Sequence, residues 1–199
     1  VFVAILVSHA LFVHAGGVGA FQRLTRAIVY TSEAGAETLS SGRLSEGDPQ
    51  YIAESDAGTF PAIENITAVG DGEFVSVGST NVRAVYTPGH TMGSVTWTWE
   101  SCAMSTCYNV VYADSLTAVS AQGFSFGTSG AADRMIESAG TIANLDCDIL
   151  LSPHPFFFGM HDKLERRDDG NPFVNNLGCT FYAETALDWL EQRLKAEGR

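Results

Sequence analysis

Four of the five histidines in this 199-residue sequence stand close to strand-like runs or glycine-rich turns. They are His9, His14, His90 and His154. Side chains at the ends of several strands converge on one edge of a sheet, which is where α/β proteins bind ligands. Neutral imidazole is the usual protein ligand of catalytic zinc, and bound zinc makes hydroxide available near neutral pH. One such histidine would be explained by a local hydrogen bond, whereas four in repeated contexts predict a metal site.

Other candidate residues are less specific. Asp114 and Ser115 follow the strand-like run 108–112, where they could border the metal edge or simply form a turn. His161 is interpreted as a loop or helix-start residue. The aromatic run 156–158 could border a substrate groove, but packing is the favoured interpretation.

The four cysteines permit two disulfides in three pairings. They are Cys102, Cys107, Cys147 and Cys179. The short spacing of the first two suits a small closed loop between two strands, which would leave the other two for a second bridge. The alternative is four buried free thiols, as in many cytosolic proteins.

The elements that position these residues alternate between strand and helix character, which indicates an α/β protein. Strands are predicted at 1–7, 27–30, 66–69, 73–77, 81–87, 94–100, 108–112 and 148–151, and helices at 18–24, 32–39, 131–145 and 180–197. Residues 8–14 are predicted to be a polar loop, and 40–62 an irregular surface excursion. Asp71-Gly72 is a hairpin signal. With no linker or repeat, residues 1–199 are predicted to form one domain.

Composition narrows the function classes. Lys and Arg number 11 against 23 Asp and Glu, a formal charge of -12, which disfavours nucleic-acid binding. No apolar run approaches the roughly 20 residues of a membrane span. The opening run 1–7 also lacks the basic start and cleavage site of a signal peptide. Because Val1 already lies in a strand-like run, we expect the natural start to lie upstream.

Several segments resemble the metal-binding motifs of the metallo-β-lactamase superfamily. The segment 8–17 resembles the signature His-x-His-x-Asp-His followed by Gly, and three later segments, 87–91, 113–115 and 152–155, resemble the remaining motifs in order. Ser115, the segment 159–164 and the cysteine placement favour subclass B3. The resemblance implies an αβ/βα sandwich with a dinuclear zinc site on one edge. It also implies that the first strands of the family, and a loop that covers the substrate, have no counterpart here.

Two ligand positions of the motif are replaced. Carried over residue by residue, the first zinc would use His9, Leu11 and His90, and the second would use Val13, His14 and His154. Leucine and valine cannot ligate, so each metal keeps two protein ligands, fewer than the three usual for catalytic zinc. Valine also cannot orient water or take its proton, as the aspartate of the family does. An altered sequence, a decayed copy and a relative with another role are three explanations that the sequence leaves open.

The resemblance implies a zinc hydrolase that opens the β-lactam ring by attack of metal-bound hydroxide, and so confers antibiotic resistance. It places Ser115 near the metal-bound water, as the catalytic candidate, and gives Ser115 and Thr117 substrate contacts. It also implies a disulfide between Cys147 and Cys179, and in some members a bridged loop where Cys102 and Cys107 lie. An exported, periplasmic or secreted monomer acting on a small molecule, without nucleic-acid or membrane partners, is expected. The alternatives are an impaired or non-catalytic homologue, or a hydrolase of another ester, thioester or lactone on this fold.

Overall fold

The computed structural model describes residues 2–198, without the side chain of residue 169. The strands are β1 (Ala4–Leu6), β2 (Ile28–Thr31), β3 (Ile66–Ala68), β4 (Phe74–Val77), β5 (Thr80–Tyr86), β6 (Val95–Ala103), β7 (Thr106–Tyr112) and β8 (Ile149–Leu151). The α-helices are α1 (Phe12–Ala15), α2 (Val18–Thr25), α3 (Glu33–Ser41), α4 (Phe126–Ser129), α5 (Ala131–Ala143), α6 (Met160–Glu165) and α7 (Gly178–Ala196), and the 3-10 helices are η1 (Pro155–Phe158) and η2 (Arg167–Asp169).

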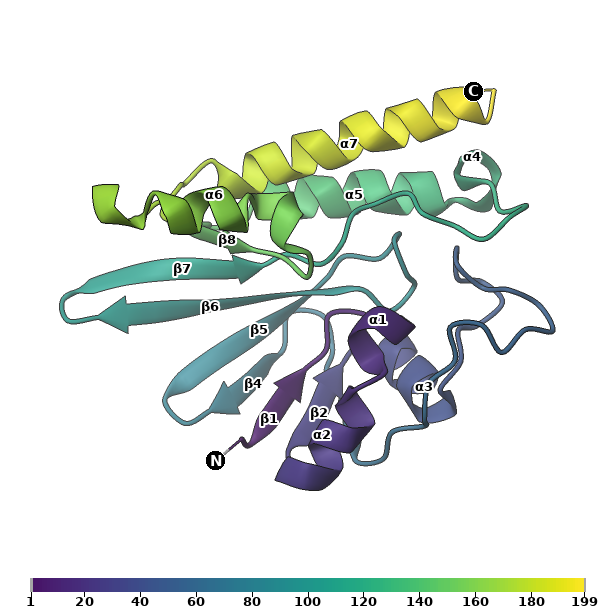
Figure 1. The fold of residues 1–199 in the computed structure, drawn as a ribbon, viewed down its shortest axis with the longest axis horizontal. Helices are drawn as coiled ribbons and strands as arrows, with labels where there is room; N and C mark the ends of the chain where they lie inside the picture. The colour runs from purple at the N-terminus through teal and green to yellow at the C-terminus, as the bar shows by residue number, and fades with distance from the viewer. Residues whose placement is uncertain (1, 199) are drawn as a thin grey trace.

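The strands form two sheets. The first is parallel throughout, in the order β1-β2-β3. The second runs β4-β5-β6-β7-β8, antiparallel until β8 joins β7 in parallel. Helices α1 to α3 lie beside the first sheet, and α5 and α7 lie together along the second (Figure 1).

Three buried clusters show how these layers are held together. One lies between the sheets and includes Val95 and Trp97 of β6, with Leu6 packed against it. A second joins β2 to α3 through Val29 and Leu39. A third joins β7 and β8 to α5 and α7. The order of layers is therefore helix, sheet, sheet, helix, and the predicted αβ/βα sandwich is confirmed.

Local sequence signals explain several of these elements. Ser32 caps α3, because its hydroxyl accepts a hydrogen bond from the backbone N–H of Gly35. An i,i+4 ion pair lies on the exposed side of α7, with Lys195 Nζ 2.7 Å from Glu191 Oε1. Trp97 of β6 is buried between the sheets, as a large apolar side chain on the inner face of a strand should be.

Two local predictions are wrong. Residues 8–14 are not all loop, because α1 begins at Phe12 and includes His14. Asp71-Gly72 forms a turn with Gly72 at φ +78°, but it connects β3 of one sheet to β4 of the other. The β-hairpin forms instead between β4 and β5. A glycine turn signal fixes the local backbone but not which strands pair afterwards.

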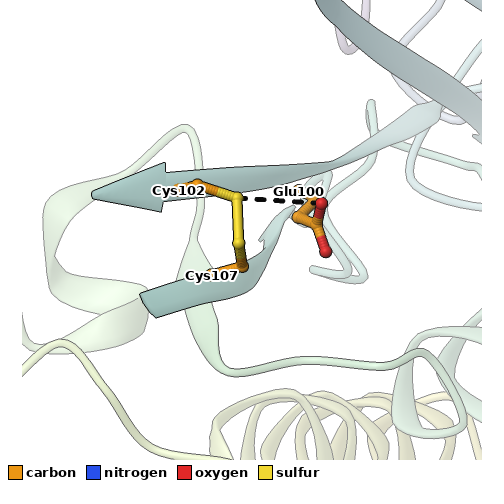
Figure 2. A group of neighbouring side chains, drawn as sticks. All are labelled: Glu100, Cys102 and Cys107. Carbon is orange, nitrogen blue, oxygen red and sulfur yellow. Dashed lines mark hydrogen bonds between the residues drawn. A yellow bond between two sulfur atoms is a disulfide. The ribbon is translucent and has the colours of Figure 1, made fainter. Parts of the chain in front are cut away.

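Both disulfides form, so the free-thiol alternative is wrong. Cys102 and Cys107 face each other across the exposed tip of the β6–β7 hairpin, next to Glu100 (Figure 2). Cys147 and Cys179 are buried and link the segment before β8 to the first turn of α7. The second bridge therefore fixes β8 against α7 in the core.

Within residues 2–198, no helix combines the length and apolar character needed to cross a membrane.

Candidate functional site

The four histidines predicted to converge do so. His9 follows β1, His14 lies in α1, and His90 and His154 follow β5 and β8. The ring centroid of His9 lies 4.3 Å from that of His14 and 4.9 Å from that of His90. The ring centroids of His14 and His154 are 5.0 Å apart. The imidazoles therefore form a continuous row in the order His90, His9, His14, His154.

A glycine fixes the backbone that carries His90. Gly89 has φ +138°, a backbone conformation that residues with a side chain rarely adopt. A Cβ at this position would lie 2.4 Å from the Met135 side chain and 3.0 Å from its backbone nitrogen in α5. The loop that carries His90 can therefore approach α5 only because residue 89 has no side chain.

His9 is supported from behind by Asp114. The Nδ1 of His9 donates to Asp114 Oδ1 over 2.6 Å, and both side chains are fully buried. Burial on its own raises the pKa of the Asp114 carboxyl, but the neighbouring His9 outweighs it and holds that pKa below its usual range. In a neutral imidazole this bond places the proton on Nδ1, so Nε2 is left as the ligating nitrogen. That Nε2 is buried and has no hydrogen-bond partner in the described part of the chain.

His90 is oriented in the same way by Thr117. Its Nδ1 lies 2.8 Å from the Thr117 carbonyl oxygen, which accepts the bond, and 3.1 Å from the Thr117 hydroxyl. Its Nε2 lies 3.5 Å from Nε2 of Gln50. Burial, with a smaller contribution from His9, lowers the pKa of His90 to about 4, so the ring is neutral at pH 7.

His14 and His154 form the other end of the row. Burial lowers the pKa of His14 to about 4 and also lowers the pKa of His154. The Nε2 of His14 is buried and finds no partner among residues 2–198. Phe156 stacks beside His154, with ring centroids 5.4 Å apart. Neutral rings with free nitrogen lone pairs are what a divalent metal requires.

The row opens into a cleft of about 370 Å³ with a largely apolar wall. Its lining residues are Leu11, Val13, His14, Gln50, His90, Thr117, Val119, His154, Phe156, Phe157 and Trp189. Thr117, for which a substrate contact is predicted, lines this cleft. The aromatic run serves both interpretations, because Phe156 and Phe157 line the cleft while Phe158 lies close to Phe173.

Other predicted residues do not reach the cleft surface. Ser115 is fully buried, its hydroxyl has no partner within the described residues, and it is absent from the cleft wall. His161 is exposed in the first turn of α6, as the helix-start interpretation predicts. The sequence reasoning did not identify Gln50, which lies in the irregular segment 40–62, where no periodicity or motif distinguishes one polar residue from another.

The donor types fit zinc, but the donor number falls short. His9 and His14 each present a buried, unpartnered Nε2, and His90 and His154 lie next to them. Yet in residues 2–198, no three histidine, cysteine or carboxylate ligand atoms gather within 4.8 Å of one another at the cleft. Such a group occurs at Glu100, Cys102 and Cys107, where the sulfurs are joined as a disulfide. The cleft thus offers two pairs of imidazoles.

No family model matches the sequence. Among solved structures, the chain is similar to MEM-A1, a subclass B3 metallo-β-lactamase isolated from a soil metagenome library, with 39% identity over 98% of this chain and 75% of that one and a TM-score of 0.93. It is similar to SMB-1, solved with mercaptoacetic acid, with 37% identity over 98% and 75% of the two chains and a TM-score of 0.92. It is also similar to BJP-1, a subclass B3 enzyme of Bradyrhizobium japonicum, with 26% identity over 98% and 74% and a TM-score of 0.88.

Proposed function

The chain belongs to the subclass B3 metallo-β-lactamases, and from that membership we propose that its histidine cleft binds zinc and hydrolyses the amide of β-lactams. The observation that carries the proposal is the row of four imidazoles, in which two buried Nε2 atoms have no hydrogen-bond partner among the described residues. Buried polar atoms are nearly always paired, so two unpaired nitrogens on adjacent rings, one of them in the cleft wall, argue for a ligand.

Two pairs of histidines in this chain would each bind one metal ion. His9 and His90 would hold one ion, and His14 and His154 the other. Zinc, when bound, polarises a carbonyl oxygen and makes hydroxide available near neutral pH. The protein then has to orient the ligands and the substrate.

The orienting contacts are already present. Asp114 fixes the tautomer of His9, and the Thr117 carbonyl fixes that of His90. Thr117 lines the cleft, so its side chain would be within reach of a bound substrate. Phe156 and Trp189 form an apolar wall that excludes water from the substrate's apolar side.

The replacements at Leu11 and Val13 set the expected level of activity. Each pair of imidazoles lacks a third protein ligand, so zinc affinity should fall well below that of a three-ligand site. Among the described residues, the lining of the cleft includes no carboxylate that could take a proton from water as the aspartate of the motif would. We therefore propose a slow hydrolase whose turnover depends on added zinc.

The direct test is an assay with a chromogenic cephalosporin at high protein concentration, with and without added zinc. Elemental analysis after dialysis against a zinc buffer gives the occupancy. Zinc-dependent turnover is the expected result. Near-zero zinc in a folded protein, together with no turnover at any zinc concentration, would reject the proposal.

A second candidate is a non-catalytic member that keeps the fold as a small-molecule binding protein. The observation that favours it is Val13, whose side chain is 72% exposed in the cleft wall at the position where the motif has aspartate. Robust turnover in the same assay would exclude this candidate. For either candidate, the two disulfides support an exported protein, since such bridges persist in oxidising compartments.

A further inference from the structure

The His9–His90 pair has a polar neighbour outside every motif of the sequence. Gln50 lines the cleft, and its Nε2 lies 3.5 Å from Nε2 of His90. Because His90 Nδ1 donates to the Thr117 carbonyl, the Gln50 amide faces the one ring nitrogen that is left to bind a ligand. Leu11 lines the same cleft and contributes no donor atom.

We propose that Gln50 is a metal-binding residue of this chain, and that its side-chain amide oxygen supplies to the His9–His90 pair the third donor that Leu11 cannot. The inference rests on the proposed function in one respect, which is that a divalent metal binds at this pair.

The other polar side chains near the pair either bond to an Nδ1 atom or lie outside the cleft wall. The Asp114 carboxylate binds His9 through Nδ1, the nitrogen opposite the free Nε2, and is absent from the cleft wall. Ser115 is fully buried behind the wall. The Thr117 hydroxyl approaches His90 at Nδ1, again the nitrogen that does not bind metal. Gln50 is thus the side chain placed on the ligating side.

The chemistry of the amide suits this role. Glutamine carries an NH₂ donor and a carbonyl acceptor at the same end, and the torsion that exchanges them is broad and roughly two-fold. When a metal takes the lone pair of His90, the NH₂ group loses its acceptor. A turn of the amide then presents the oxygen, and side-chain amide oxygens are established ligands of divalent cations.

Gln50 is held in place by a buried carboxylate. Asp48 is only 4% exposed, and its Oδ1 accepts the backbone N–H of Gln50 over 2.9 Å. The Asp48 carboxylate also accepts the backbone N–H of Met92, on the loop that carries His90. The carbonyl of Pro49 accepts the backbone N–H of Ala121 over 2.9 Å. Asp48 is therefore a positioning residue that fixes the Gln50 loop to the histidine loop.

The test is metal affinity, measured without substrate. Zn²⁺ competition against a chromophoric chelator and Co²⁺ absorption titration would be compared for the wild type, Gln50→Ala and Gln50→Glu. Gln192→Ala, at an exposed glutamine of α7, is the matched control. Gln50→Ala should lower the metal affinity of the His9–His90 pair at least about 10-fold and change the visible Co²⁺ spectrum. Even removal of a residue that only orients a ligand costs about that much in affinity. Gln50→Glu should keep or raise the affinity, and Gln192→Ala should stay within about twofold.

A double-mutant cycle separates a ligand from a merely structural residue. In a Leu11→His background the imidazole supplies the third donor, so Gln50→Ala should then cost less than about threefold. An unchanged Zn²⁺ affinity and Co²⁺ spectrum in Gln50→Ala, or an equal loss in both backgrounds, would overturn the inference. Metal binding that depends on Gln50 without any turnover would keep the inference and reject the proposed hydrolase. Turnover with Gln50-independent affinity would do the reverse.

Discussion

The two ends of the histidine row differ in burial and in the hydrogen bonds that orient their rings. At the His9–His90 end both rings are buried, and Asp114 and Thr117 each accept a bond from an Nδ1. At the His14–His154 end the rings are partly exposed, and no side-chain hydrogen bond orients either ring among the residues described. Orienting contacts raise ligand basicity and reduce the entropy lost on binding. The first pair should therefore load with metal before the second.

The largest effect is expected when both ends regain a full ligand set. Leu11→His combined with Val13→Asp should raise kcat/KM for a chromogenic cephalosporin about 10³-fold, because each ion gains a ligand and the attacking water gains a proton acceptor. Steady-state rates at saturating zinc measure this. Val3→Asp is the matched control, since it places a carboxylate at an exposed valine outside the cleft wall and should leave the rate unchanged. No gain in the double variant would show that the chain lacks more than two ligands.

The next effect concerns the support of the weaker end. The Cys147–Cys179 bridge spans 32 residues and fixes the segment before β8, the strand that precedes His154. Replacing both cysteines with serine should lower the free energy of unfolding by about 3.5 kcal/mol. The same change at Cys102 and Cys107, five residues apart at an exposed tip, should cost about 2 kcal/mol or less.

Denaturant titration of both variants measures these costs. Zinc titration should show that loss of the buried bridge weakens the second equivalent of metal more than the first. If both equivalents weaken alike, the two ends of the row are not independent.

A smaller effect should mark the stronger end. Asp114→Asn keeps the shape of the side chain but removes the charge that fixes the His9 tautomer. The first equivalent of zinc should bind about 10- to 100-fold more weakly, with the second nearly unaffected. Zinc competition measures this, with Asp188→Asn at an exposed aspartate of α7 as the matched control, which should leave both equivalents unchanged. An equal loss for both equivalents would contradict the proposed difference in support.

The smallest effect is expected at Glu197, outside the cleft, where a substitution should change stability but not metal binding. Glu197 accepts hydrogen bonds from Arg193, Gly127 and Ser125, joining the end of α7 to α4. Burial alone raises the pKa of Glu197, but these bonds outweigh it and lower the pKa from 4.5 to about 2. The stabilisation is therefore complete above pH 4.5 and is lost as the pH falls toward 2.

Glu197→Gln should lower the free energy of unfolding at pH 7 by about 1–2 kcal/mol, and this difference should shrink at pH 3. Denaturant titrations at the two pH values check both statements. Metal affinity should not change, because Glu197 contacts α4 rather than the cleft. A difference that grows on acidification would contradict the assigned cause.

The sequence predicted most where chemistry and periodicity act together. Strand ends followed by histidine located His9, His90 and His154, and the helical pattern of 180–197 located α7. It failed where a tertiary contact decides. Ala15 at the end of the short helix α1 packs with Val7 and Val29 beside the first sheet, a contact that no local pattern shows. Gln50 acquires its position from Asp48 and from a loop some forty residues later. Burial of Ser115 is likewise set by layers that meet only in the folded chain.

Gly89 gives the cleft a mechanical link to the second helical layer. Because a Cβ at residue 89 would clash with Met135, the loop that carries His90 lies close against α5, and a shift of α5 should move that loop. Substitutions on the inner face of α5 should therefore displace the His90 ring, although α5 is remote from His90 in the sequence. The position of the His90 ring thus depends on how closely α5 packs against the loop that precedes it.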